Sequence, residues 1–218
     1  MDLRRTQLYT EIFPGLFHIP HSQGGREKQS SSYFLIRPYG NYLIYGGYTD
    51  TTLESFMESR GGVAVQYVAS LDSLNASHIR LFVKFGAPAV VAPGKSAPFH
   101  KDIRLVDGPM YQYLDQKIEI FGLNGEKFSE DEGKDDHAAV YMVSLGSKKI
   151  LFCNELLSIS GSGVQKLSNT DQKKRLSELS NVIKNEEPDI IFTPTHGKEF
   201  LYYILTRDER ERISSLLD

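Results

Sequence analysis

Four residues of the sequence match the end of a phosphate-binding loop. Pro93-Gly94-Lys95-Ser96 supplies the glycine, lysine and serine that close the pattern GxxxxGK[ST], in which backbone amides and the lysine hold phosphate oxygens. The first glycine of that pattern would fall at Ala89, however, and no long helix is predicted directly after Ser96. The sequence therefore does not support a phosphate-binding loop at this position.

The GxSxG and GxGxxG motifs and the single cysteine give no evidence of a catalytic nucleophile or a nucleotide-binding loop. There is no GxSxG elbow, and Gly161-Ser162-Gly163 departs from GxGxxG because Lys166 stands where the last glycine belongs, so we expect a loop there. Cys153 is the only cysteine and lies in an apolar run with no adjacent histidine, which favours a buried core thiol over a nucleophile. Three histidines stand among prolines and aromatic residues, where we expect packing or surface roles: His18, His21 and His100.

Composition indicates a soluble globular protein. The 218 residues are 40% hydrophobic and 24% charged, and no change of composition divides them, so we expect a single domain over residues 1–218. No apolar run is long enough to span a membrane, and no signal peptide is recognised. The net charge of −3 gives no reason to expect nucleic acid or an anionic membrane as a partner. A single cysteine predicts a reducing, cytoplasmic location.

The elements that must position any site are short strands and helices along the first half of the chain. Runs rich in aromatic and β-branched residues predict strands at Leu16–Ile19, Ser32–Ile36, Tyr42–Tyr45, Val63–Ser70 and Ala89–Ala92. Apolar residues at helical spacing predict helices at Thr51–Glu58 and Ser77–Phe85. Asp50 or Thr51 is the expected N-cap of the first helix, and Gly86 is expected to end the second. Pro38 and Gly40 predict a hairpin turn.

The second half begins with strands and ends with helices. Strands are predicted at Ile103–Val106, Tyr111–Leu114, Lys117–Phe121, His137–Leu145, Lys149–Cys153 and Asp189–Phe192. Helices are predicted at Asp171–Glu187 and Arg207–Leu217. The acidic segment Glu126–Asp136 is expected to be a solvated loop, and Gly146-Ser147 a tight hairpin turn.

Several segments, taken in order, resemble one known family. They are Phe13-Pro14-Gly15-Leu16-Phe17, Asn41–Gly47, Ser77-His78-Ile79, Phe85-Gly86-Ala87-Pro88, Ile150–Glu155 and Thr195-His196-Gly197. Their order and spacing resemble the metallo-β-lactamase superfamily over most of the chain. Asn41–Gly47 matches a segment that the family usually writes LIDTG, with Tyr45 in place of the aspartate. The resemblance implies a four-layer αββα sandwich, with metal ions held by loops at one edge of two sheets.

The resemblance also implies a metal site that has lost most of its ligands. The family motif HxHxDH aligns with Ser73–His78, of which only His78 is kept. The next histidine of the family falls at Asp135, or at Asp136 or His137 if the alignment shifts by one or two residues. The bridging aspartate of the family becomes Glu155, and its last histidine is kept as His196. The resemblance therefore leaves a second-site set of His78, Glu155 and His196, with Asp72 or Asp135 as possible additional ligands.

Two functions are compatible with this pattern. The first is a mononuclear hydrolase of unknown substrate, in which one zinc or iron ion activates water and Glu155 or Asp135 acts as general base. The second is an inactive, metal-free relative that binds a small molecule or a protein partner, or forms a homo-oligomer. Aromatic residues flank the sequence positions of the expected site and could line a ligand pocket: Tyr45, Tyr48, Tyr202 and Tyr203.

Overall fold

The computed structural model describes residues 9–21, 28–69, 73–91, 102–107, 118–124, 137–153, 156–160, 162–166, 173–197 and 202–217. Within these ranges, ten strands form a first sheet: β1 Thr10–Phe13, β2 Leu16–His21, β3 Lys28–Leu35, β4 Tyr42–Ile44, β5 Val65–Tyr67, β6 Ala89–Val91, β7 Leu105–Asp107, β11 Leu157–Ser160, β12 Gly163–Lys166 and β14 Thr195–Gly197. Five form a second sheet: β8 Ile118–Asn124, β9 His137–Leu145, β10 Lys148–Phe152, β13 Ile190–Phe192 and β15 Tyr202–Ile204. The helices of the same ranges are α1 Thr51–Glu58, α2 Ala76–Phe85, α3 Lys173–Glu186 and α4 Arg207–Leu217.

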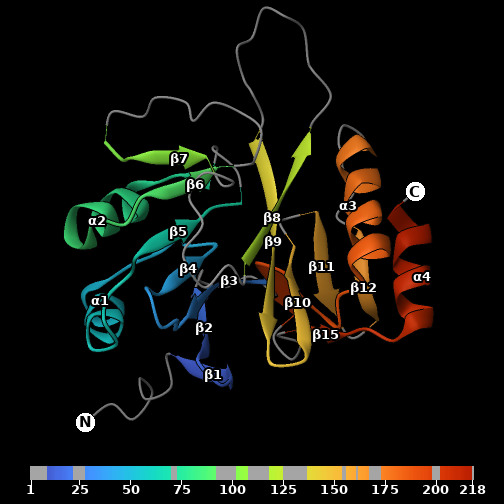
Figure 1. The fold of residues 1–218 in the computed structure, drawn as a ribbon, viewed down its shortest axis with the longest axis horizontal. Helices are drawn as coiled ribbons and strands as arrows, with labels where there is room; N and C mark the ends of the chain where they lie inside the picture. The colour runs from blue at the N-terminus through green and yellow to red at the C-terminus, as the bar shows by residue number, and fades with distance from the viewer. Residues whose placement is uncertain are drawn as a thin grey trace, which may run out of the picture.

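The two sheets face each other, and a pair of helices covers the outer face of each (Figure 1). The first sheet runs in the order β12-β11-β14-β3-β4-β5-β6-β7, and β2 pairs with β3 and with β1. The second sheet runs β15-β13-β10-β9-β8. In Figure 1, α1 and α2 lie beyond the first sheet, while α3 and α4 lie beyond the second. This arrangement confirms the predicted αββα sandwich.

Alternation along the central strands builds the layers. On β3, Tyr33 and Leu35 enter the core between the sheets, while Phe34 faces the helices on the other side. On β10, Phe152 enters the core between the sheets and Leu151 faces α3 and α4. Because successive side chains of a strand point to opposite faces, strands that are buried on both sides are apolar throughout. This is why the sequence shows short continuous apolar runs here.

Each helix pair buries one apolar stripe. Leu53 and Met57 of α1 and Leu81 of α2 pack in one cluster with Phe34 and Leu43 of the first sheet. Two cations of α2 form ion pairs with the buried carboxylate of Glu54 on α1 and so tie the two helices together: Arg80 and Lys84. No helix in the described ranges is long and apolar enough to cross a membrane.

The predicted helices agree closely with the observed ones. Thr51–Glu58 and Arg207–Leu217 are confirmed at both ends, with the Asp50 side chain accepting from the Leu53 N–H at 2.8 Å as the predicted N-cap. Gly86 ends α2 with φ 71°, the left-handed geometry that favours glycine. The predicted Pro38–Gly40 hairpin joins β3 to β4, which pair antiparallel.

Strands were predicted less completely. The strand predicted at Val63–Ser70 is confirmed only over Val65–Tyr67. Five strands were not predicted: β1, β11, β12, β14 and β15. The loop expected at Gly161-Ser162-Gly163 is wrong at its end, because Gly163 pairs with Ser160 and begins β12. The strand predicted at Tyr111–Leu114, the acidic loop and the Pro93–Ser96 segment lie outside the described residues, and the single domain over residues 1–218 stays a prediction.

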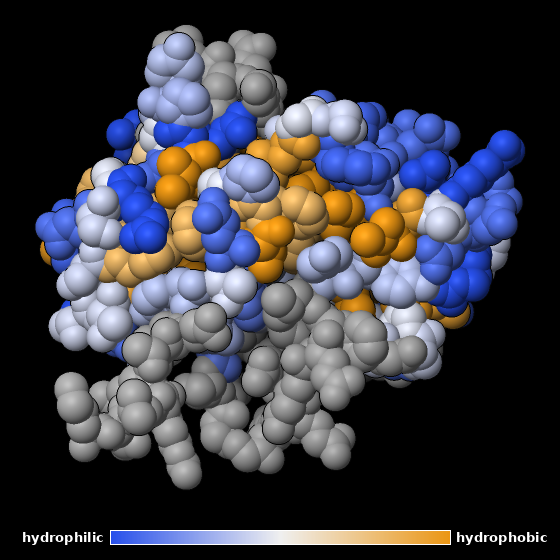
Figure 2. All heavy atoms as spheres, turned by 90° about the horizontal axis from the view of Figure 1, so that it is seen from below, coloured by the Kyte–Doolittle hydropathy of each residue, from blue (hydrophilic) through white to orange (hydrophobic). Residues whose placement is uncertain are grey.

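Hydrophobic side chains gather across the middle of the face shown in Figure 2. Six partly buried hydrophobic residues pack against the core between the sheets: Ile12, Phe13, Ala69, Ile120, Leu145 and Tyr202. Phe13 contacts the rings of Phe192 and Tyr202, with centroid distances of 6.4 and 5.7 Å. These residues are therefore the outer margin of the internal core.

Candidate functional site

The start of α2 holds His78 through a hydrogen bond of its own ring. Asn75 is the N-cap, and its Oδ1 accepts from the Ser77 N–H at 2.9 Å. The backbone N–H of Asn75 donates in return to Nδ1 of His78 at 3.2 Å. This is a capping box in which histidine takes the place that Glu or Gln usually holds. The Asn75 side chain also donates to the carbonyl of Gly47 at 3.2 Å, which joins α2 to the turn after β4.

The ring of His78 is buried. Its side chain is 1% exposed, and burial, followed by the nearby charge of His21, lowers its pKa to about 4. Its backbone carbonyl accepts from Nε2 of Gln66 on β5 at 3.0 Å. His78 is therefore fixed and neutral at physiological pH.

The capping hydrogen bond determines which ring nitrogen of His78 carries the proton. A backbone N–H can only donate, so Nδ1 must present its lone pair to Asn75. A neutral imidazole has one N–H, which then lies on Nε2. Among the residues that the structure describes, that buried Nε2 has no hydrogen-bond partner. His78 thus presents an unpaired N–H donor.

His21 lies near His78 and has the complementary arrangement. The ring is 6% exposed, and burial lowers its pKa to about 4. Its Nε2 lies 2.7 Å from Oγ of Ser32, whose hydroxyl donates to the carbonyl of Tyr45 at 2.6 Å. Because that hydroxyl has a single proton, the His21 Nε2 must donate to it, and Nδ1 keeps a lone pair.

Two glycines follow β4 beside these rings. A Cβ built on Gly46 would lie 3.6 Å from Nε2 of His78, and one built on Gly47 would lie 3.8 Å from Nδ1 of His21. Nε2 of His78 and Nδ1 of His21 thus lie beside consecutive residues without side chains. We refer to Gly46 and Gly47 as the glycine turn.

The resemblance places Tyr45 where the family has an aspartate, and in the structure Tyr45 has a structural role. It is 6% exposed and has φ 59°, which is rare for a residue other than glycine. Its hydroxyl crosses to the second sheet and donates to the carbonyl of Phe152 at 2.6 Å, while its N–H donates to Tyr67 at 2.9 Å. Tyr45 therefore links the sheets where the resemblance implied an acidic residue.

His196 lies on a strand of the same sheet as His21. On β14 it pairs with Gln29 of β3 and with Ile159 of β11. Ser30 of β3 pairs with both His21 and Thr195, so β3 separates the strands of the two histidines. Adjacent strands are about 4.8 Å apart, which puts the two backbones about 10 Å apart. The side chain of His196 lies outside the described residues.

Most of the other predicted site residues also lie outside the described residues. These are Glu155, Asp135, Asp136 and Asp72, together with the side chain of His137, whose backbone begins β9 opposite Asn124. No group of three or more His, Cys, Asp or Glu that could hold a metal ion occurs among the described residues. Convergence of His78, Glu155 and His196 on one ion therefore stays a prediction.

Several sequence expectations are clarified by the structure. Cys153 is fully buried and burial raises its pKa, as expected for a core thiol. His18 is buried and lies 2.7 Å from the Ser31 hydroxyl, which confirms a packing role, while His100 lies outside the described residues. Tyr202 and Tyr203 belong to β15 of the second sheet, where Tyr202 packs on Phe192.

The packing or surface role expected for His21 is confirmed as packing, because its buried ring is hydrogen-bonded to Ser32. The relevant signal was the serine pair Ser31-Ser32, because β2 and β3 pair antiparallel and bring these hydroxyls beside the histidines of β2. Sequence alone did not give the register of that pairing.

Comparisons with known proteins identify the fold. No protein-family model matches the sequence, and no curated protein matches it. An archaeal metallo-β-lactamase superfamily protein from Sulfolobus tokodaii matches the structure with a TM-score of 0.64 and 13% identity, over 94% of this chain and 86% of that chain. The chain has the metallo-β-lactamase fold.

Two further structures with this fold match this chain over nearly their whole length. A metallo-β-lactamase from Pontibacter korlensis has a TM-score of 0.61 and 14% identity, with 96% of this chain and 97% of that chain covered. The enzyme FIM-1 from Pseudomonas aeruginosa, in its mono-zinc form, has a TM-score of 0.60 and 13% identity, with 96% and 93% covered. At these identities the metallo-β-lactamase fold is shared, and function has to be argued from the site.

The fold implies a metal ion, and the hydrogen bonds of His78 do not fit one. A histidine ligand needs a lone pair on the nitrogen that faces the ion. With Nδ1 engaged by the Asn75 N–H, the buried Nε2 of His78 carries a proton instead. Ligation through Nε2 would require the proton to move to Nδ1, and the ring would then lose the capping hydrogen bond that it accepts from Asn75. In this arrangement His78 is a hydrogen-bond donor.

Proposed function

We propose that this chain is a non-catalytic binding module on a metallo-β-lactamase fold, which works without a metal ion. The observation that carries the proposal is the hydrogen bond from the Asn75 backbone to Nδ1 of His78, since it leaves a proton on the only nitrogen that could face an ion. The ligand of this module is a small molecule or a protein partner, bound at the edge of the two sheets where the resemblance places metal ions. The single cysteine is buried, which supports a reducing compartment such as the cytoplasm.

Tyr45 and His21 support the same proposal. At the position where the resemblance expects an aspartate, a tyrosine bonds across to the second sheet. His21 carries its proton on the nitrogen that faces Ser32, so its hydrogen bonds, like those of His78, are those of a neutral polar pair. Both histidines are kept neutral by burial, and neither is paired with a described carboxylate that would make it a general base.

A mononuclear zinc or iron hydrolase is the second candidate. The observation that favours it is the unpartnered Nε2 of His78, because a buried ring nitrogen without a partner is also what a vacated ligand would show. FIM-1, with a similar fold, has been obtained in a mono-zinc form. This candidate needs Glu155 and His196 to converge with His78, and Glu155 or Asp135 to act as base.

Metal content separates the two candidates. The purified full-length chain would be incubated with excess Zn²⁺, desalted, and analysed by elemental mass spectrometry beside His78→Ala and His196→Ala. We expect the wild-type chain to retain no more zinc than either variant. Thr52→Ala, at an exposed position of α1, is the control for nonspecific changes in zinc content during purification. Circular dichroism checks that each protein is folded.

One equivalent of zinc in the wild type and in Thr52→Ala, lost in both histidine variants, would reject the binding module in its metal-free form. The same result would support the hydrolase and justify a screen of ester and phosphodiester substrates.

A further inference from the structure

The loop between β4 and α1 lies against two buried rings. A Cβ built on Gly46 would lie 3.6 Å from Nε2 of His78, and one built on Gly47 would lie 3.6 Å from Cε1 of His21. The Cβ on Gly46 would also come within 2.7 Å of the Leu43 side chain, so the backbone packs here without free space. Because the two rings are only 1% and 6% exposed, the glycine turn is part of what covers them.

Within the described part of the chain, this loop is held by side chains rather than by its own backbone. No backbone–backbone hydrogen bond between described residues involves residues 46–49. Two side chains from the first turn of α2 bind the loop instead. The Asn75 amide donates to the Gly47 carbonyl at 3.2 Å, and the Thr49 N–H donates to Oγ of Ser77 at 3.1 Å. We refer to these two hydrogen bonds as the clasp.

The cap of α2 orients the clasp. Oδ1 of Asn75 accepts from the Ser77 N–H at 2.9 Å, while Nδ2 of the same side chain donates to the loop. The His78 ring holds the Asn75 backbone through the capping box. Because Oδ1 and Nδ2 belong to one planar amide, the cap that orients Asn75 also orients its bond to Gly47. The loop and the cap therefore form one connected network, in which the loss of one bond weakens the others.

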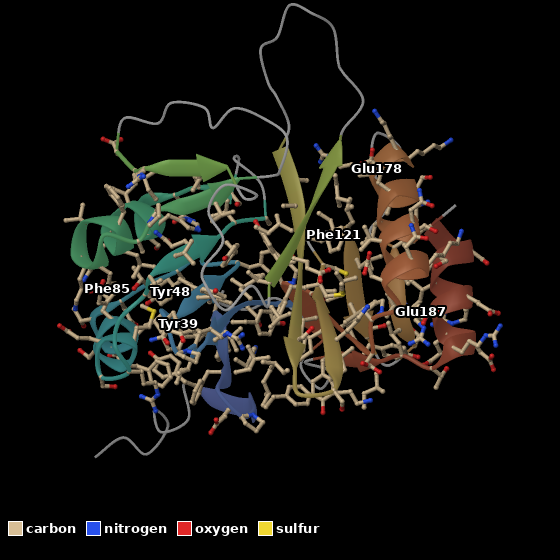
Figure 3. All side chains as sticks on the ribbon, in the orientation of Figure 1. Tyr39, Tyr48, Phe85, Phe121, Glu178 and Glu187 are labelled. Atoms are coloured by element: carbon tan, nitrogen blue, oxygen red, sulfur yellow. The ribbon has the colours of Figure 1, made fainter. Side chains whose placement is uncertain are left out.

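Both ends of the loop are anchored independently of the clasp. At one end, the Tyr45 N–H donates to the Tyr67 carbonyl at 2.9 Å. At the other, Asp50 caps α1. Tyr48, labelled in Figure 3, lies between these anchors and is 50% exposed. A segment that is fixed at both ends and bound in its middle by two side chains can open locally while the rest of the fold stays intact.

We propose that residues 46–49 form a strap over His21 and His78, and that the clasp keeps the strap closed. The resemblance aligns Asn75 and Ser77 with two ligands of the HxHxDH motif, and here both side chains bind the strap. The proposal deepens the binding module above and rests on its independence of metal, because an ion held at these positions would compete for the same side chains. An open strap exposes two neutral rings to a ligand.

Amide hydrogen exchange of the full chain in buffer with a chelator, followed by nuclear magnetic resonance, tests the proposal. Asn75→Asp keeps an acceptor for the cap of α2 but removes the donor to Gly47. The Thr49 amide keeps its own partner in this variant. If the strap opens as a unit, that amide should nevertheless exchange about fivefold faster, which is the effect of losing one hydrogen bond. Modification of His21 and His78 by diethyl pyrocarbonate should accelerate by a similar factor.

Ser77→Ala is the second variant, and it should also accelerate the modification of both histidines, whereas Thr52→Ala should match the wild type. The proposal is overturned if the Thr49 amide is unprotected in the wild type. It is also overturned if Asn75→Asp and Ser77→Ala leave the modification of the histidines unchanged. Slower exchange of the Thr49 amide in the wild type after Zn²⁺ replaces the chelator would instead refute the metal-independent function, whatever the two variants show.

Discussion

Lowering the pH from neutral should weaken this fold through two buried rings. His21 and His78 have pKa values of about 4 in the folded chain, whereas an unfolded histidine has a pKa of about 6.5. Between these values the unfolded chain binds more protons than the folded one. The contribution of these two neutral rings to the free energy of unfolding is therefore fully present above about pH 6.5. It is lost as the pH falls towards 4.

The size of the effect follows from the same values. One pKa unit corresponds to about 1.4 kcal/mol, so each ring contributes about 3 kcal/mol over the whole window. Between pH 7.5 and 5.5 the loss is about 1.3 kcal/mol for each ring, or about 2.6 kcal/mol for both. This is a large part of the total stability of a typical domain, which is about 5–15 kcal/mol.

The measurement is urea unfolding, followed by circular dichroism, at a series of pH values from 7.5 to 5.5. His78→Asn and His21→Asn should each lose about half of the pH dependence that the pair contributes, and Thr52→Ala should keep all of it. The slope against pH is compared rather than the absolute stability, because each substitution also removes hydrogen bonds. If the wild type and both histidine variants shared one slope, the two rings would not be buried in their neutral form, and the tautomer argument would fail with them.

Three substitutions test other parts of the structure by chemical unfolding. Tyr45→Phe removes the hydroxyl that bonds to the Phe152 carbonyl and should cost about 1–2 kcal/mol, with no loss expected if that bond is absent in solution. Gly62→Ala should lower the free energy of unfolding by about 1–3 kcal/mol, because φ is 76° and the new Cβ would lie 3.0 Å from the Phe85 ring. An unchanged unfolding midpoint would contradict this geometry. Glu54→Gln should lower the free energy of unfolding by about 1–2 kcal/mol, because it weakens the ion pairs that join α1 to α2. If this loss were the same at low and at high salt, it would not have an electrostatic origin.

Local signals in the sequence predicted much of the fold. The N-cap at Asp50 and the left-handed glycine at position 86 are local features, so the helices that they bound could be predicted. The long strand β9 was predicted at both ends, because nine residues give a clear apolar pattern. By contrast, β14 and β15 have three residues each and form by pairing with strands that are distant in sequence. No local pattern could therefore predict them.

The sequence predicted the candidate site less completely than it predicted the fold. His78 was found because it stands in a motif-like position at a helix start, but motifs do not state which nitrogen carries a proton. That depends on whether the Asn75 N–H reaches the ring, which is a matter of helix-cap geometry. The proximity of His21 to His78 was not predicted, because it depends on the register between β2 and β3 and on the packing of α2 against β5.

Tyr45, which the resemblance places where the family has an aspartate, takes part in the packing of the two sheets. A carboxylate at this position would stand in the core that Tyr45 now fills, next to the Tyr141 ring at 5.9 Å and without the bond to Phe152. An unpaired buried charge is costly unless a metal or a hydrogen-bond donor compensates it. Replacing Tyr45 with aspartate would therefore remove a contact between the sheets. Likewise, restoring a ligand role to His78 would first break the cap of α2. Among the predicted ligands whose side chains the structure describes, His78 supports the fold through this cap, which favours a role as a hydrogen-bonding residue over a role as a ligand.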